Sequence, residues 1–295
     1  MSLSGLPRLA LIAGPTASGK SARAIALAEA ANGTVINADA SQVYRDLHIL
    51  SARPSAEEER RVPHLLFGYR DGARACSAAE WADDAKAAIA ATHAAGRLPI
   101  LVGGTGLYIR TLLDGIAPVP EIDPQIRAEV RRFSAAETHA ALAKEDPDAA
   151  ARLHPNDTAR LHRALEVIRS TGTPIAAWRE SRVGGIADSV DIDLETIVTS
   201  VPELYARCDA RVDEMMAAGA LAEVAALRAR RLDAALPVMR AIGVIQLIQY
   251  LDGALLLDSA VAAIKQATRN YAKRQRTWLR HQLPTPAKTV ADKEG

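Results

Sequence analysis

The stretch that decides the fold is RLALIAGPTASGKS, which occupies residues 8–21. Its apolar half predicts a buried strand, and the rest fits the G-x-x-x-x-G-K-[ST] phosphate-loop pattern in its required strand–loop–helix context. In such a loop the backbone N–H groups turn onto phosphate oxygens, the lysine reaches the terminal phosphates, and the serine hydroxyl ligates Mg²⁺. The residues predicted to bind phosphate are Gly14, Pro15, Thr16, Ala17, Ser18, Gly19, Lys20 and Ser21, with Ser21 also the metal ligand. The pattern alone leaves open an NTPase, a small-molecule kinase and a transferase that releases diphosphate.

Strand-like and helix-like stretches alternate downstream of this loop. A helix is expected from Lys20, and strands are expected over residues 33–39 and 97–104. Between those strands, Ser77 and Glu80 have the capping-box spacing that starts a helix. This alternation is typical of α/β proteins, so we predict a P-loop NTPase-like parallel sheet flanked by helices.

The pattern changes near Pro118, where a proline-rich stretch is followed by helical signals only. A strand pattern returns at residues 191–201, and the helix expected after it carries Met215 and Met216, which we predict to be core residues. We therefore expect the following organisation: a core of residues 1–120 and 187–283, an inserted all-helical domain over 121–186, and a loose tail at 284–295.

Composition excludes several classes of protein. The 295 residues contain no apolar run of about 18 residues, the length that crosses a bilayer. The apolar N-terminal stretch lacks a basic segment and leads into the glycine loop, so we interpret it as a strand and not as a signal peptide. Cys76 and Cys208 lack metal-ligand spacing and are expected to be reduced thiols in a cytoplasmic protein. The net charge of +1 does not by itself indicate a nucleic-acid partner, but basic residues gather without acids over residues 269–281.

Two further positions are expected near the phosphate loop, because ligands of open parallel sheets bind outside the carboxyl ends of the strands. Asp39 ends the second predicted strand and is a candidate general base or magnesium ligand, although an aspartate there is equally suited to cap a helix. Thr105 lies in the glycine turn after the next strand. It can hydrogen-bond a carboxylate or a substrate, or belong to a plain strand-to-helix turn.

Six motifs occur together in order: GPTASGKS, NADASQVYRDL, VGGTGLYIR, HPNDTARLHRALEV, PVMRAIG and AKRQRTWLR. From about Leu9 to Arg280 the chain thereby resembles the tRNA dimethylallyltransferases, also called tRNA isopentenyltransferases. The resemblance implies transfer of a dimethylallyl group from dimethylallyl diphosphate to N6 of the adenosine immediately 3′ of the anticodon in tRNA, with release of diphosphate. It also implies Mg²⁺ as cofactor, the anticodon stem-loop as the bound RNA, and a monomer.

The resemblance assigns roles to individual residues. The loop from Gly14 to Ser21 holds the donor's diphosphate, although such loops are often labelled ATP sites, and Arg240 of PVMRAIG helps neutralise its charge. Asp39 matches the general base that takes the proton from N6, and Thr105 matches the residue that helps to fix Asp39 and the amine. The residues implied to contact tRNA are Asp39, Ala40, Ser41, Gln42, Thr105, Arg127, Ala159, Arg160, Leu161, His162 and Arg163.

The chain departs from the family pattern at two places. Ala40 replaces the usual serine after the aspartate, and Val244-Ile245 replaces the usual tyrosine-arginine after PVMRAIG. The second change removes a positive charge from a segment expected to contact tRNA. Rival functions are a P-loop kinase of a small metabolite, a prenyltransferase acting on free adenine nucleotides, and a nucleotide-gated RNA-binding module without chemistry.

Overall fold

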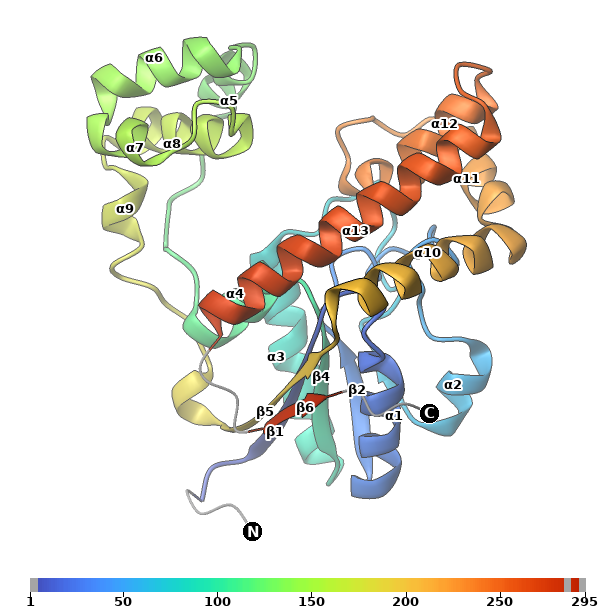
Figure 1. Cartoon of the computed structure of the whole chain (residues 1–295). Coiled ribbons are helices and arrows are strands. Elements are labelled where there is room, and N and C mark those ends of the chain that lie inside the picture. The colour runs from blue at the N-terminus through green and yellow to red at the C-terminus, as the bar shows by residue number, and fades with distance from the viewer. Residues whose placement is uncertain (1–4, 284–287, 292–295) are drawn as a thin grey trace. The chain divides into compact units, whose positions relative to one another are not determined.

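A computed structural model of the chain describes residues 5–283 and 288–291 (Figure 1). Its elements in chain order are β1 (Arg8–Ala13), α1 (Lys20–Ala31), β2 (Gly33–Asn37), α2 (Ala56–Arg61), β3 (His64–Leu65), α3 (Ala78–Ala94), β4 (Leu98–Gly103), α4 (Gly106–Asp114), α5 (Pro124–Val130), α6 (Ala135–Glu145), α7 (Pro147–Arg152), α8 (Thr158–Thr171), α9 (Ile175–Trp178), the 3₁₀ helix η1 (Ala187–Ser189), β5 (Asp191–Val198), α10 (Val201–Ala217), α11 (Ala220–Ala229), the 3₁₀ helix η2 (Pro237–Arg240), α12 (Val244–Leu251), α13 (Leu257–Gln282) and β6 (Lys288–Ala291).

The strands form one parallel sheet in the order β3-β2-β4-β1-β5-β6. The register aligns Ala13, the last residue of β1, with Gly103, and Asn37, the last residue of β2, with Val102. The three loops that follow β1, β2 and β4 therefore leave the sheet at the same edge. This α/β architecture confirms the predicted fold class, and it gathers the phosphate loop, Asp39 and Thr105 at one edge, as parallel topology requires.

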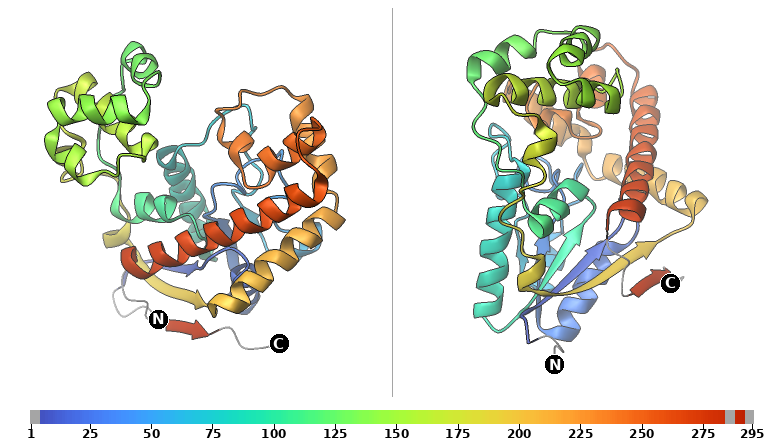
Figure 2. Two further views of the ribbon diagram at one scale, coloured as in Figure 1. Left: turned by 45° about the horizontal axis from the view of Figure 1, so that its top comes forward. Right: turned by 90° about the vertical axis from the view of Figure 1, so that its left-hand side faces the viewer.

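Helices cover both faces of the sheet. Figure 2 shows α1 and α3 on opposite sides of it. On the α1 side, Ile12, Val35 and Ile100 pack against Ala24 and Ile25 of the helix. The other side contains Trp81 of α3, which is fully buried and stacks on Tyr108 of α4 with ring centroids 4.5 Å apart. Helix α3 begins with the predicted capping box, since Ser77 accepts from the Glu80 N–H and Glu80 accepts from the Ser77 N–H.

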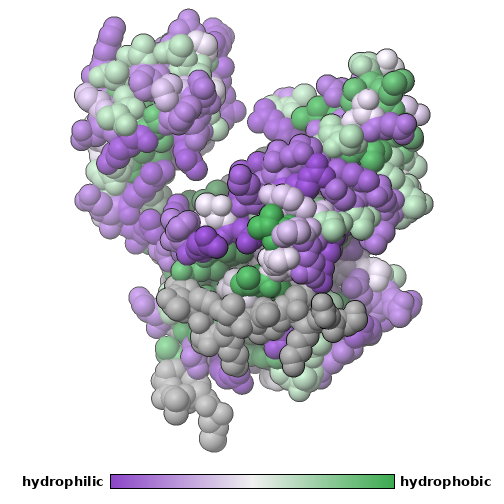
Figure 3. All heavy atoms as spheres, viewed as in Figure 1, coloured by the Kyte–Doolittle hydropathy of each residue, from purple (hydrophilic) through white to green (hydrophobic). Residues whose placement is uncertain are grey.

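Helix α13 brings the C-terminal part of the chain back across the sheet edge. Its buried residues recur every three or four positions, as expected for a helix with one face in the core. They are Ala260, Ile264, Thr268, Ala272, Gln275 and Leu279. The opposite face is exposed and carries Lys273, Arg274 and Arg280, and Figure 3 shows the outward surface of this helix as largely hydrophilic. The face with the basic residues is therefore free of the core.

The chain divides into two compact units, which we describe separately. The larger consists of residues 1–113 and 187–295, and the smaller of residues 114–186. The smaller unit contains α5 to α9 and has its own core, which includes Val130, Leu142, Leu161 and Leu165. It begins at Asp114, whereas the sequence placed the start of the insertion at residue 121. The difference arises because Ile116 already pairs with Val183 within the smaller unit.

Two expectations about the larger unit need correction. The tail at 284–295, expected to be loose, contains β6, which pairs with β5 and is the outermost strand on that side of the sheet; the rest of that tail lies outside the described residues. Met215 and Met216, expected in the core, are only half-buried, and Met215 lines a cavity. Among the described residues, no helix is both long and apolar enough to cross a membrane.

Candidate active site

The phosphate loop curls over the first turn of α1. Ala17 and Gly19 both adopt left-handed backbone conformations, with φ of 62° and 83°. At Gly14 a Cβ atom would lie 2.6 Å from Ser18 Oγ, so the close approach of the two ends of the loop requires glycine there. The N-terminus of α1 then faces the space that the loop encloses. Such an end, with unpaired N–H groups and a positive dipole, favours an anion.

Two side chains of the loop are prepared for a negatively charged ligand. Lys20 is 7% exposed, and its Nζ donates to the Pro15 carbonyl oxygen at 3.2 Å. Burial lowers the pKa of Lys20 to about 8; the negative charge of Asp39 opposes this shift, and Arg211 adds to it. Ser18 is fully buried, and its Oγ has no hydrogen-bond partner in the described part of the chain. A phosphate oxygen would satisfy both groups, so the loop fits a diphosphate.

Gln275 of α13 ties the phosphate loop to the second glycine turn. Its Oε1 accepts from the Thr16 N–H at 2.8 Å, and its Nε2 donates to the Gly104 carbonyl oxygen at 3.0 Å. A Cβ atom at Gly104 would lie 2.2 Å from that Nε2, so only glycine admits the amide. Gln275 is 4% exposed; its bond to Gly104 is buried, and its bond to Thr16 is partly buried. The position of the phosphate loop thus depends on a side chain from the last long helix.

Asp39 lies just beyond β2 and is held by one carboxylate oxygen. The Ser41 N–H and hydroxyl both donate to Asp39 Oδ1, at 2.9 and 2.6 Å. The buried Asn37 amide fixes the backbone, accepting from the Asp39 N–H and donating to the Asp39 carbonyl oxygen. Within the described residues no hydrogen bond reaches Oδ2, so this oxygen is free to accept a proton. The alternative role as a helix cap is wrong, because the next helix after Asp39 is α2, which begins only at Ala56.

Thr105 contacts Ala40, the residue that follows Asp39, and not the Asp39 carboxylate itself. Its Oγ1 accepts from the Ala40 N–H at 3.0 Å, and the Tyr271 hydroxyl is hydrogen-bonded to Thr105. Burial raises the pKa of Tyr271, so its hydroxyl stays protonated at neutral pH. Thr105 therefore supports the backbone beside Asp39 and does not touch the carboxylate directly.

A cavity of about 920 Å³ within the larger unit is lined by both the phosphate loop and Asp39, whereas Thr105 is not part of its lining. The sequence-predicted residues that line it are Thr16, Ala17, Ser18, Gly19, Lys20, Ser21, Asp39, Ala40, Ser41, Gln42 and Arg240. Gly14 and Pro15, the first two residues of the phosphate loop, are buried and do not line the cavity. The Gln42 Nε2 is already engaged, because it donates to the carbonyl oxygens of Ser51 and Ala52 at 3.0 Å each. Its amide nitrogen is therefore not free to read a base.

Three cavity residues were missed by sequence reasoning. Arg211 of α10 donates to the Thr16 hydroxyl at 3.4 Å, and burial lowers its pKa. Tyr271 and Arg274 of α13 also line the cavity. Arg211 directly precedes Val212 on the apolar face of α10, and an arginine beside such a face was the one available signal. Together with Lys20 and Arg240, these arginines make one wall of the cavity cationic.

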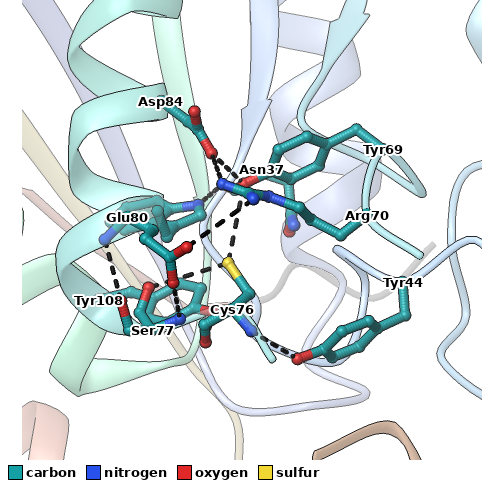
Figure 4. Close-up of polar contacts among 10 residues, drawn as sticks. Asn37, Tyr44, Tyr69, Arg70, Cys76, Ser77, Glu80, Asp84 and Tyr108 are labelled. Carbon is teal, nitrogen blue, oxygen red and sulfur yellow. Dashed lines mark hydrogen bonds and ion pairs between the residues drawn. The ribbon is translucent and has the colours of Figure 1, made fainter. Parts of the chain in front are cut away.

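A polar cluster holds the segment that follows β3 against α3 (Figure 4). Tyr69 and Arg70 both donate to Asp84 Oδ2, at 2.7 and 2.6 Å. The Cys76 N–H donates to the Tyr44 hydroxyl at 3.1 Å. Since Tyr44 also lines the cavity, the cluster fixes part of the cavity wall. Burial raises the pKa of Tyr69, which keeps its hydroxyl a donor.

The smaller unit contains the remaining predicted RNA contacts. Arg127 has a buried Nε without a partner in the described residues, and the pKa of the half-buried Arg163 is lowered by burial and by the charge of Arg127. Ala159 and Arg160 are exposed. Leu161 is fully buried in the core of this unit, so its side chain is not presented to RNA, and any contact there would be made by the backbone. His162 is occupied by a hydrogen bond of 3.0 Å with the Phe133 carbonyl oxygen.

Comparisons with known proteins identify the family of the chain. The model of the IPP transferase family matches residues 42–282. The chain belongs to this family. Among its relatives, the IPP transferase family member named tRNA dimethylallyltransferase from Sphingopyxis alaskensis is 62% identical over 94% of this chain and 90% of its own length. The protein of the same name from Zymomonas mobilis is 53% identical over 96% and 91%.

Solved structures agree with this membership of the IPP transferase family. The tRNA isopentenylpyrophosphate transferase of Bacillus halodurans superposes with a TM-score of 0.71 at 34% identity, covering 97% of this chain and 91% of that one. A eukaryotic dimethylallyltransferase solved acting on tRNA gives a TM-score of 0.79 at 28% identity, covering 92% and 70%. The family departures also have a structural account. Ser41 supplies a hydroxyl to Asp39 beside Ala40, while Val244 is buried and Ile245 is half exposed at the start of α12.

Proposed function

We propose that this IPP transferase family member transfers a dimethylallyl group from dimethylallyl diphosphate to N6 of the adenosine immediately 3′ of the anticodon in tRNA. One observation carries the proposal: the phosphate loop and the Asp39 carboxylate open onto the same cavity. The phosphate loop suits a leaving diphosphate, and the carboxylate suits an incoming amine that must lose a proton. In the reaction the allylic C–O bond breaks, its electron pair leaves with the diphosphate, and the N6–C bond forms.

The phosphate loop stabilises the leaving group. Lys20 and Arg211 place positive charge at the phosphate loop, and Arg240 lines the same cavity. Charge on the diphosphate grows as the C–O bond breaks, and preorganised cations in a partly buried site stabilise such a transition state strongly. Ser21 lines the same space, and its hydroxyl is the ligand that this chain would offer to Mg²⁺. When bound there, the ion supplies further charge neutralisation at the phosphate oxygens.

Asp39 removes the proton from the attacking amine. Its Oδ1 is fixed by Ser41, so the carboxylate cannot rotate freely, and Oδ2 remains to accept the N6 proton. A positioned general base is typically worth about 10²–10⁴ in rate. Thr105 and Asn37 keep the backbone of Asp39 in place and act through it.

The RNA is held by basic side chains outside the phosphate loop. In the smaller unit, Arg127, Arg160 and Arg163 offer guanidinium groups for phosphates, and in the larger unit the outward face of α13 offers Lys273 and Arg280. The target base must leave its stack to reach an enclosed cavity, as for other enzymes that modify bases. We further propose that the acceptor is the anticodon stem-loop, and that the protein acts as a monomer in the cytoplasm.

The test uses labelled dimethylallyl diphosphate, Mg²⁺ and an unmodified anticodon stem-loop whose target is adenosine. We expect label in the RNA with the natural protein, and a loss of about 10²–10⁴ in kcat with Asp39→Asn. Asp83→Asn is the matched control, because Asp83 is 77% exposed on α3. Label in free AMP would instead indicate a nucleotide prenyltransferase. Phosphate transfer from ATP would indicate a kinase, and RNA binding without transfer would indicate a binding module.

A further inference from the structure

The segment His48–Ala52 forms part of the cavity wall without belonging to any helix or strand. Three consecutive backbone N–H groups of this segment converge on one carboxylate. Glu223 of α11 accepts from His48 and Ile49 through Oε1, at 2.5 and 2.8 Å, and from Leu50 through Oε2, at 2.9 Å. Charge-assisted hydrogen bonds are about twice as strong as neutral ones, so Glu223 is a firm anchor.

The same segment is held from its other side. Gln42 Nε2 donates to the carbonyl oxygens of Ser51 and Ala52, and the Ser51 hydroxyl donates to the Leu47 carbonyl oxygen at 2.5 Å. The side chain of Leu50 packs onto Gly243, where a Cβ atom would lie 2.9 Å from Leu50 Cδ1. The segment is thus held between the sheet edge and the α11–α12 region, and Glu223 accepts three of the hydrogen bonds that hold it.

The segment His48–Ala52 presents the apolar side chains of Ile49 and Leu50 to the cavity. The larger aliphatic residues and the methionine of the lining are Ile25, Ile49, Leu50, Val212, Met215, Ile242 and Ile264. Lys20 and Arg211 supply positive charge at the phosphate loop, so a ligand with a diphosphate at that end and a hydrocarbon at the other matches the lining. Forcing extra methylenes against a wall that cannot retreat is unfavourable.

We propose that Glu223 is a positioning residue that determines which length of prenyl chain the cavity admits. By anchoring His48–Leu50 it holds Ile49 and Leu50 as a fixed wall, and this wall excludes donors longer than the five-carbon group. The inference rests on the proposed function and adds a determinant of donor specificity to it. Glu223 touches neither the phosphate loop nor Asp39, so it acts through the segment and not on the reacting atoms.

The decisive variant is Glu223→Gln, which keeps the size of the side chain. The amide replaces one acceptor oxygen by an NH₂ group, which faces backbone N–H groups and cannot accept from them. At least one of the three anchoring bonds is lost, and the wall gains freedom to move. Glu203→Gln is the matched control, because Glu203 also lies in the first turn of a helix but bonds Ser200 and Arg207 of its own neighbourhood.

The experiment compares kcat/KM for dimethylallyl diphosphate with kcat/KM for geranyl diphosphate, its ten-carbon homologue, on the same RNA. The ratio of the two values is unaffected by the fraction of folded protein, so a merely structural role would not change it. We expect the natural protein and Glu203→Gln to prefer the shorter donor equally, and Glu223→Gln to lose about ten-fold of that preference. Leu50→Ala, which shortens the wall directly, should shift the ratio in the same direction. Glu223→Asp, which keeps the charge but draws it back by one methylene, should give a smaller shift and serves if Glu223→Gln does not fold.

An unchanged ratio in Glu223→Gln and Glu223→Asp overturns the inference, whether or not Leu50→Ala shifts it. A ratio that shifts equally in Glu203→Gln overturns it as well, since the effect would then not be specific to the anchor. Failure of the natural protein to transfer the five-carbon group at all refutes the proposed function instead, and so is distinguishable from failure of this inference.

Discussion

Replacing Gln275 by alanine should destabilise the larger unit by about 2–4 kcal/mol, because each buried polar group left unpaired costs about 1–3 kcal/mol. The variant removes the acceptor of the Thr16 N–H and the donor to the Gly104 carbonyl oxygen. The hydrogen bond to the Gly104 carbonyl oxygen is buried, but the one from the Thr16 N–H is only partly buried. The expected loss of unfolding free energy therefore lies below the upper limit for two fully buried unpaired groups. Gln266→Ala is the matched control on α13, since Gln266 is exposed and bonds only its own helix.

Urea unfolding followed by tryptophan fluorescence measures this loss. The chain has three tryptophans, of which Trp178 lies in the smaller unit and Trp81 and Trp278 in the larger. In a Trp178→Phe background the signal therefore reports the unit that contains Gln275. A difference below about 0.5 kcal/mol between Gln275→Ala and Gln266→Ala, the usual scatter for surface changes, would refute the reasoning.

Three further outcomes are expected. The kcat/KM for the donor should fall as pH rises through about 8, because Lys20 loses its proton there and the donor is anionic. The variant Lys20→Arg should remove that decline, and a flat pH profile of kcat/KM in the natural protein would contradict the prediction. Ser41→Ala should lower kcat at saturating RNA by about ten-fold, since Asp39 Oδ1 loses its hydroxyl partner, whereas Ser41→Thr should retain activity; equal rates in all three proteins would exclude this role. Trp81→Phe should cost about 2–4 kcal/mol of unfolding free energy in urea, because the Asn37 carbonyl oxygen loses the indole N–H and a gap opens in the core; a loss no larger than that of a surface change would argue against it.

The sequence predicts those parts of the molecule that local chemistry decides. The phosphate loop, the capping box at Ser77 and the strand that leads to Asp39 each follow from residues within one short window, and the structure has the corresponding elements there, although β2 ends at Asn37, two residues before Asp39. Parallel topology then predicts that these loops share an edge. This much of the candidate site needs no contact between distant segments.

The remainder of the site depends on contacts that no window contains. Arg211 and Gln275 reach the phosphate loop from helices more than 190 residues further along the chain, and Tyr271 reaches Thr105 from the same helix as Gln275. Helical periodicity assigns such residues to a face but does not say what that face meets. The hydrogen bonds between Glu223 and the segment His48–Leu50 could not be predicted from the sequence either. A glutamate in the first turn of a helix is ordinarily explained by the helix dipole.

The bond between Thr16 and Gln275 joins residues 259 positions apart, and this spacing constrains how the protein matures during synthesis. A ribosome releases the phosphate loop early, together with the first strands that flank it, but the amide that completes the loop emerges only with the last long helix. Contacts of such high sequence separation close late and slowly. A nascent chain therefore carries an incompletely supported phosphate loop at least until Gln275 has been synthesised.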